Sequence, residues 1–152
     1  MALVLSVLES EIRKIIDQEF EQFEGFPQTA QETATRWANA IDIYASSVIP
    51  PSTTTQQAKQ SLESIFLGLN VNGALIFPLG FTVYASILAT GMLPLFVSVP
   101  PPSPIVLAPV FAAGLSGAPS STCAQLMSVT IDAWFRTGTA TPSSGGPAIP
   151  WS

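Results

Sequence analysis

The sequence predicts an all-α protein in which five to six helices form a bundle-like domain and an extended, Pro/Gly-rich C-terminal tail follows. Hydrophobic residues recur every three to four positions along several segments, as on one face of a helix, and glycines and prolines separate these segments. Residues 139–152 lack this periodicity and are rich in Thr, Pro, Ser and Gly. We therefore expect a helical domain over residues 1–138, with amphipathic helices in 1–70 and charge-poor helices in 74–138, and an extended tail over 139–152.

The first helix is expected over residues 3–24. Its apolar stripe comprises Leu5, Leu8, Ile12, Ile15, Ile16, Phe20 and Phe23. Six of the ten acidic residues of the chain lie in the same segment, mostly away from this stripe, and Gly25 and Pro27 end the helix. The six carboxylates fit a solvated helix face, because acid–base pairs face each other across a cleft and calcium loops alternate Asp or Asn with Gly.

The second and third helices have clear boundaries. Thr29 and Glu32 have the spacing of a capping box, which favours a helix start at this point, and Pro50-Pro51 ends the segment. Hydroxyl residues at 52–55 begin the third helix, which continues to Leu69. The polar and Gly positions at 70–73 predict the next turn.

The second half of the chain differs in character, because residues 64–131 contain no charged side chain. A buried helix is expected over residues 74–93. The prolines at 100–104 predict a stiff, polyproline-like connector, and Ser103-Pro104 begins a short helix that ends at Leu115. The last helix begins at 120–122 and continues to Arg136, with Gly138 as its left-handed cap.

The tail carries the candidate partner-binding residues Ile149, Pro150 and Trp151. A large indole in a Pro-rich tail has no helix of its own to pack on, and leaving it in water forgoes roughly 2–3 kcal/mol of burial. Trp151 is therefore expected to anchor the tail against protein, either on its own domain or in a neighbouring chain, where Trp is a favoured contact residue. Gly145-Gly146 permits one sharp bend.

Composition indicates that other proteins cover part of this chain. Charged residues make up 10% of the sequence, against about 25% in an ordinary soluble domain. The expected partners are other proteins, including copies of the same chain. Nucleic acid is excluded as a partner, because a net charge of −5 and five scattered basic residues provide no cluster for phosphates.

The sequence also excludes most catalytic chemistry. It contains no histidine, which removes the usual general base and the commonest metal ligand, and its single cysteine, Cys123, is expected to be a small buried residue. Neither Lys14 nor Lys59 stands in a Ser-x-x-Lys pattern. We therefore expect no enzyme activity, no catalytic residue, no metal site and no cofactor.

The main alternative is a small holin-like membrane protein that spans the bilayer at residues 75–93, a stretch of sufficient length without a charge. Pro78, Gly80 and several hydroxyl residues dilute the hydrophobicity of this stretch, and Lys and Arg do not flank it. A soluble core helix is equally apolar, so membrane insertion is the less favoured interpretation. The first residues lack the basic start of a signal peptide, so synthesis in the cytoplasm is expected.

Two segments carry a resemblance to a known class of proteins. Residues 131–140, read as Ile-Asp-Ala-Trp-Phe-Arg-Thr-Gly-Thr-Ala, precede Gly146-Pro147 and Pro150-Trp151, and residues 36–44 read Arg-Trp-Ala-Asn-Ala-Ile-Asp-Ile-Tyr. With the junction at 48–54, these segments resemble small virion structural proteins of tailed bacteriophages. The resemblance implies a subunit of the virion, in the tail, baseplate or neck, that is made in the host cytoplasm and binds other virion proteins. It assigns no role to a particular residue.

Overall fold

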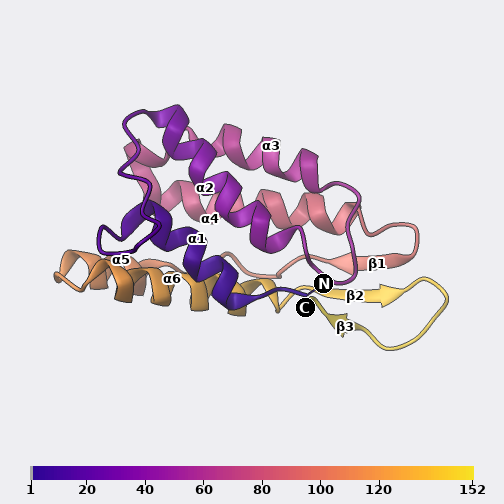
Figure 1. Ribbon diagram of the computed structural model, residues 1–152. Helices are drawn as coiled ribbons and strands as arrows, with labels where there is room; N and C mark the ends of the chain where they lie inside the picture. Colours follow the sequence, from indigo (N-terminus) through magenta and orange to yellow (C-terminus); the bar gives the residue numbers. More distant parts are fainter. Residues whose placement is uncertain (1) are drawn as a thin grey trace.

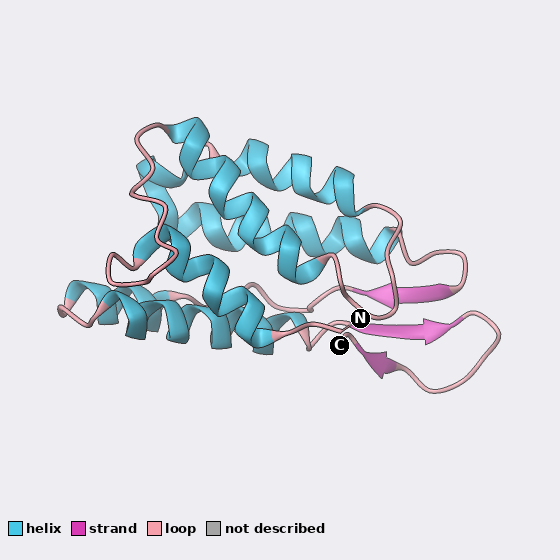
Figure 2. Ribbon diagram, in the orientation of Figure 1, coloured by secondary structure: helices cyan, strands magenta, loops and turns pink. Residues whose placement is uncertain are grey.

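The computed structural model describes residues 2–152, which form six helices and a small three-stranded sheet (Figures 1 and 2). The helices are α1 (Leu5–Ile16), α2 (Ala30–Ala45), α3 (Thr55–Phe66), α4 (Leu69–Thr90), α5 (Ala108–Leu115) and α6 (Ser120–Phe135). The strands are β1 (Phe96–Val99), β2 (Thr139–Pro142) and β3 (Ile149–Pro150). The prediction of a mainly helical domain is confirmed, whereas the sheet was not expected.

Helix α1 ends at Ile16, earlier than the periodicity predicted. Asp17 adopts an extended backbone, with φ −107° and ψ 98°. Its carboxylate accepts hydrogen bonds from the Arg13 guanidinium at 2.8 Å and from the Glu19 backbone N–H at 3.3 Å. An Asp side chain that bonds the backbone two residues later competes with the helical ladder, so the chain turns here although Phe20 and Phe23 continue the apolar spacing.

The starts of α2 and α4 follow local capping chemistry. Thr29 accepts the Glu32 N–H at 3.1 Å, as predicted, while the Glu32 carboxylate accepts the N–H of Gln28 at 2.8 Å. The turn predicted at 70–73 is a kink within α4, where Asn72 has φ −155° and ψ 78°. The Asn72 side chain accepts the Leu75 N–H at 3.3 Å, so the regular part of α4 is capped at the expected position.

Helix α5 begins at Ala108, later than the predicted start at Ser103-Pro104. The indole N–H of Trp134 donates to the Ser103 carbonyl at 2.6 Å. This bond fixes the segment before α5 against α6, and the short helix starts only after it.

The sheet incorporates the residues expected to form a separate tail. Strand β2 pairs antiparallel with β1 and with β3, in the order β1-β2-β3. Gly145 and Gly146, with φ of 95° and 137°, form the bend between β2 and β3 that the sequence predicted. Residues 139–152 are therefore a β-hairpin attached to the helical domain through β1, and the sheet lies at one end of the helices, beside both termini (Figure 1).

The helices follow one another around a common core. α4 packs on α3, α3 on α2, α2 on α1, α1 on α6 and α6 on α5. Aromatic rings fill the interior, and the largest fully buried side chains include Trp151, Tyr44, Tyr84, Phe66, Phe81 and Phe135. The ring of Phe81 lies 6.1 Å from that of Trp134, so α4 and α6 also meet in the core.

Candidate functional site

The structure separates the three candidate partner-binding residues. Ile149 is 36% exposed and Pro150 is exposed, whereas Trp151 is 0% exposed. The Trp151 backbone N–H donates to the Gly138 carbonyl and its indole N–H to the Ser98 hydroxyl, both at 2.9 Å. The sequence left open whether Trp151 is buried in its own domain or in a neighbouring chain, and the structure places it in its own domain. Of the three candidates, Ile149 and Pro150 remain at the surface.

Gly138 has a different role from the predicted helix cap. It is absent from the glycines with positive φ among residues 2–152. A Cβ atom at this position would lie 2.6 Å from the Trp151 ring, so Gly138 is the residue that lets the indole approach the backbone.

The charged side chains lie on α1, the loop after it, α2, α3 and the end of α6. The residues that the structure describes form four ion pairs, Arg13–Asp17, Lys14–Glu11, Arg36–Glu32 and Arg136–Asp132. The Lys14–Glu11 and Arg36–Glu32 pairs lie within α1 and α2, and each contributes roughly 0.3–0.5 kcal/mol. The other two pairs join the last turn of α1 or of α6 to the residue that follows it. The excess carboxylates lie with them, on α1, the loop after it, α2 and α3.

Two tyrosine–aspartate hydrogen bonds cross the helical core. The Tyr44 hydroxyl donates to Asp132 at 2.6 Å and joins α2 to α6, while the Tyr84 hydroxyl donates to Asp42 at 3.1 Å and joins α4 to α2. Burial and the adjacent carboxylates raise the pKa of both phenols. Burial also raises the pKa of Asp42, against the opposing effects of the Tyr84 bond and of Lys59. These links hold the helices together and leave no phenolate for chemistry at neutral pH.

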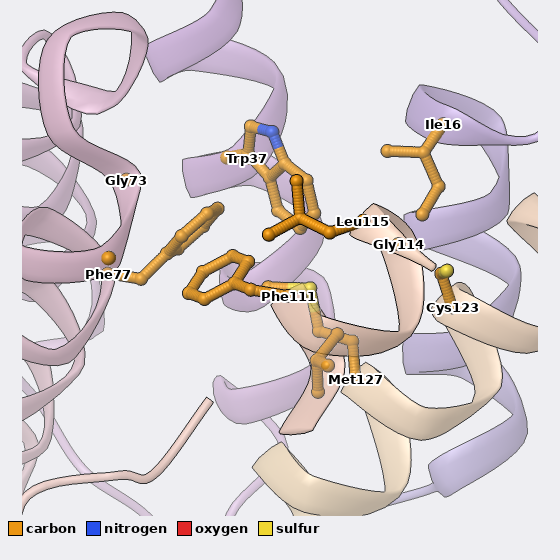
Figure 3. A pocket seen from close by; sticks show the side chains of 11 residues that line it. Ile16, Trp37, Gly73, Phe77, Phe111, Gly114, Leu115, Cys123 and Met127 are labelled. Atoms are coloured by element: carbon orange, nitrogen blue, oxygen red, sulfur yellow. The ribbon is translucent and has the colours of Figure 1, made fainter. Parts of the chain in front are cut away.

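An apolar hollow lies where α4, α5 and α6 approach one another (Figure 3). It has a volume of about 510 Å³. Its walls are Gly73, Ala74 and Phe77 of α4, Val110, Phe111, Gly114 and Leu115 of α5, Cys123 and Met127 of α6, and Ile16 and Trp37. These eleven residues are uncharged, and the side-chain atoms other than carbon among them are the Trp37 indole nitrogen and the sulfurs of Cys123 and Met127. Cys123 is half-buried.

A second hollow of about 260 Å³ continues the first along α4. The two share Ala74 and Phe111, and the second extends to Pro78 on one side and to residues 105–108 on the other. We call the two together the α4/α5 groove. It is apolar along its whole length, since every side chain of the second hollow is a hydrocarbon.

Large apolar side chains protrude around this groove. Leu115 is 91% exposed and Val106 is 66% exposed, and both line it. On α4, Val71, Leu75 and Leu79 are 90%, 63% and 49% exposed, beside the lining residues Gly73, Ala74 and Pro78. Large exposed apolar side chains beside an apolar hollow indicate an interaction site.

Sequence reasoning missed the groove although its signal was present. The groove walls come almost entirely from residues 64–131, the charge-free interval, and only Val110 of α5 is buried. A short helix that is apolar on all sides and buries one residue leaves most of its hydrophobic surface exposed.

A metal site would need at least three His, Cys, Asp or Glu side chains close together. Residues 2–152 contain no such group.

Helix α4 also bears on the membrane alternative. Of the helices described, it alone is long and apolar enough to span a bilayer, and 39% of its most apolar stretch is buried. Its buried face carries Phe77, Phe81, Tyr84 and Leu88, which are core residues of the domain.

Comparison of the chain with protein-family models, with curated proteins and with solved structures gives no match. The class of protein is therefore defined by the fold and the surface themselves: a mainly helical domain with an apolar groove between α4 and α5.

Proposed function

We propose that this chain is a structural subunit of a phage virion that acts through protein–protein assembly, in contact with copies of itself and with other virion proteins. The observation that carries the proposal is the charge-free, apolar surface around the α4/α5 groove. The virion as location, in the tail, baseplate or neck, rests on the resemblance of residues 36–44 and 131–140. The proposal includes no catalytic activity, cofactor or nucleic-acid partner.

The size of the exposed patch supports assembly over a lone monomer. Burying a Val or Leu side chain is worth roughly 1.5–3 kcal/mol, so the five side chains around the groove together provide on the order of 10 kcal/mol. Association costs an estimated 4–15 kcal/mol in lost motional freedom. The patch alone thus supplies a favourable free energy of the same size as the cost, before the groove walls are counted.

The test is the composition of purified particles. Virions banded in a density gradient should contain the chain at a fixed ratio to the major capsid protein, and it should resist removal by high salt because the contacts are apolar. A soluble host protein measured in the same fractions is the control. Recovery of the chain only in the host lysate, with none in the particles, would contradict the proposal.

Membrane insertion of α4 is the second candidate function. The length and apolar composition of this helix favour insertion. Insertion would remove Phe77, Phe81 and Tyr84 from the core and break the Tyr84–Asp42 hydrogen bond. A carbonate wash of the membrane fraction separates the candidates. Retention of the chain in the washed membranes supports insertion, whereas complete recovery in the soluble or particle fraction removes it.

A further inference from the structure

Asn72 lies at the kink of α4, and Gly73 follows it directly. Asn72 is exposed, and its φ of −155° and ψ of 78° are outside the helical region. Its side-chain oxygen accepts the Leu75 N–H at 3.3 Å, which is longer than the usual N–H···O distance and makes the bond weak. The carboxamide is therefore held loosely, at a point where the backbone is already irregular.

The peptide unit between Asn72 and Gly73 can rotate while the chain on both sides stays in place. The N–H groups of Val71 and Asn72 both donate to the Gly68 carbonyl, at 3.0 and 3.1 Å, and the regular helix continues after the kink. A peptide unit rotates between fixed neighbours when ψ of the first residue and φ of the second change in opposite directions. Here the rotation gives residue 73 a positive φ, which glycine adopts without steric cost.

This rotation brings the Gly73 nitrogen towards the side-chain carbon Cγ of Asn72. At ψ of 78° the nitrogen lies anti to Cβ across the Cα–C bond, because of the handedness of an L-residue. The reversed peptide unit places the nitrogen on the same side as Cβ, where it can reach Cγ. Because an N-cap carbonyl accepts the first hydrogen bond of its helix, the rotated form is a minor conformer.

We propose that Asn72 is a site of spontaneous deamidation, which converts it to aspartate and isoaspartate in the folded chain. The Gly73 nitrogen attacks Cγ and forms a C–N bond, the Cγ–Nδ2 bond breaks, and ammonia leaves with the Gly73 amide proton. Water then opens the cyclic imide. Cleavage of the new bond to Cγ gives aspartate, and cleavage of the bond to the backbone carbonyl carbon gives isoaspartate. The reaction consumes water and needs no oxidant, metal or cofactor.

Either product changes the surface beside the α4/α5 groove. Residues 64–131 contain no charged side chain, and Gly73 and Ala74 line the groove, so the new carboxylate is the first charge in this interval. Aspartate remains a good N-cap, and its negative charge is favourable at the start of a helix. Isoaspartate lengthens the main chain and loses the N-cap geometry, so it should loosen the first turn after the kink.

The other two asparagines of the chain are internal controls. Asn70 is also exposed on α4, but the β-branched Val71 follows it. Asn39 lies within α2, and Ala40 follows it. Both following residues carry a Cβ atom, which disfavours the positive φ that the rotation requires.

The experiment incubates the purified full-length chain under native conditions at neutral pH for several weeks. Mass spectrometry of chymotryptic peptides measures the conversion of amide to acid at each asparagine, and labelling by an isoaspartyl methyltransferase measures isoaspartate. Product should accumulate at Asn72 well before it accumulates at Asn70 or Asn39. Gly73→Ala should slow the reaction at Asn72 by about tenfold, because a residue with a Cβ atom resists the positive φ.

Circular dichroism verifies that Gly73→Ala folds, and the comparison among the three asparagines of the wild-type chain does not depend on this variant. Absence of product at Asn72, or equal rates at all three asparagines, overturns the inference. An unchanged rate in Gly73→Ala also overturns it, because the reaction would then not require the rotation. The modification is independent of the proposed function, since purified virions can contain the chain whether or not Asn72 reacts.

Discussion

The side chain of Trp151 joins the C-terminal hairpin to the helical core. Its ring stacks on Phe135 at a centroid distance of 6.4 Å, beside the open face of Gly138. Substitution of a fully buried Trp by Ala leaves a cavity and loses its transfer free energy, which together amount to about 3–5 kcal/mol. We expect Trp151→Ala to lower the free energy of unfolding of the isolated chain by this amount, measured by urea denaturation.

The neighbouring Ile149 provides the control for this measurement. It is 36% exposed on β3, so Ile149→Ala should cost less than about 1 kcal/mol. Equal urea midpoints for Trp151→Ala and the wild-type chain would show that the indole does not hold the hairpin.

Asp42 predicts a pH dependence of stability. Burial raises its pKa above the ordinary value, so folding favours the protonated carboxyl. A carboxyl whose pKa is higher in the folded than in the unfolded chain stabilises the fold while it is protonated. This stability is fully present below the pKa of the unfolded chain and is lost as pH rises through the pKa of the folded chain. Asp42→Asn keeps an oxygen acceptor for Tyr84 and removes the titration. We expect this variant to match the wild-type chain in acid and to become the more stable of the two as pH rises from about 4 to 7.

Urea midpoints at several pH values measure this difference. Glu21→Gln, which changes an exposed carboxyl in the loop after α1, supplies the baseline for loss of a single negative charge. Parallel pH curves for Asp42→Asn and the wild-type chain would contradict the role assigned to burial.

At the scale of elements, the contact between α3 and α4 depends on Gly80. A Cβ atom there would lie 2.4 Å from Cε1 of Phe66, a fully buried ring, so the two helices are close because the side chain is absent. Gly80→Ala should destabilise the domain by about 1–3 kcal/mol, since overpacking forces side chains or helices to shift.

Gly73 of the same helix is the matched test. Its Cβ would meet Phe77 at an ordinary 3.8 Å, and its φ is not positive. Gly73→Ala should therefore stabilise the chain or leave it unchanged, because Ala is the better helix former by up to about 1 kcal/mol. Thermal denaturation of both variants measures the contrast, and the interpretation fails if Gly80→Ala melts at or above the wild-type temperature.

The helices were largely predictable from the sequence, and the strands were not. Periodicity and the Thr29–Glu32 cap located α2 to within a few residues, because both signals are local. The end of α1 depends on which backbone group the Asp17 side chain contacts, which spacing does not encode. Strand β1 has four residues, and its partner β2 lies far along the chain, so its pairing depends on tertiary contacts.

At the scale of the whole molecule, the charge-free interval correctly indicated an unusual surface but not its shape. The absence of charge over residues 64–131 is compatible with a buried core, a bilayer span or an interface. The groove lies where α4, α5 and α6 approach one another, and the position of α5 depends on how the segment before it is held against α6 by the Trp134–Ser103 hydrogen bond. Trp151 was identified as an anchor from its chemistry, while the choice of its own domain required the position of Gly138.

Helix α6 packs on α1 and is bonded to α2, so it joins segments that are far apart in the sequence. The Arg136 guanidinium donates to the Leu3 carbonyl across 133 positions, and Tyr44 reaches Asp132 across 88. Contacts of such sequence separation form late, because loop closure costs entropy before they stabilise the chain. We expect α2, α3 and α4, which are consecutive in the chain and pack on one another, to gain protection from pulsed hydrogen exchange first. Leu8 and Ile12 on the apolar face of α1 are 0% exposed in the folded chain. In this order of folding, their side chains stay exposed to solvent until α6 packs on α1.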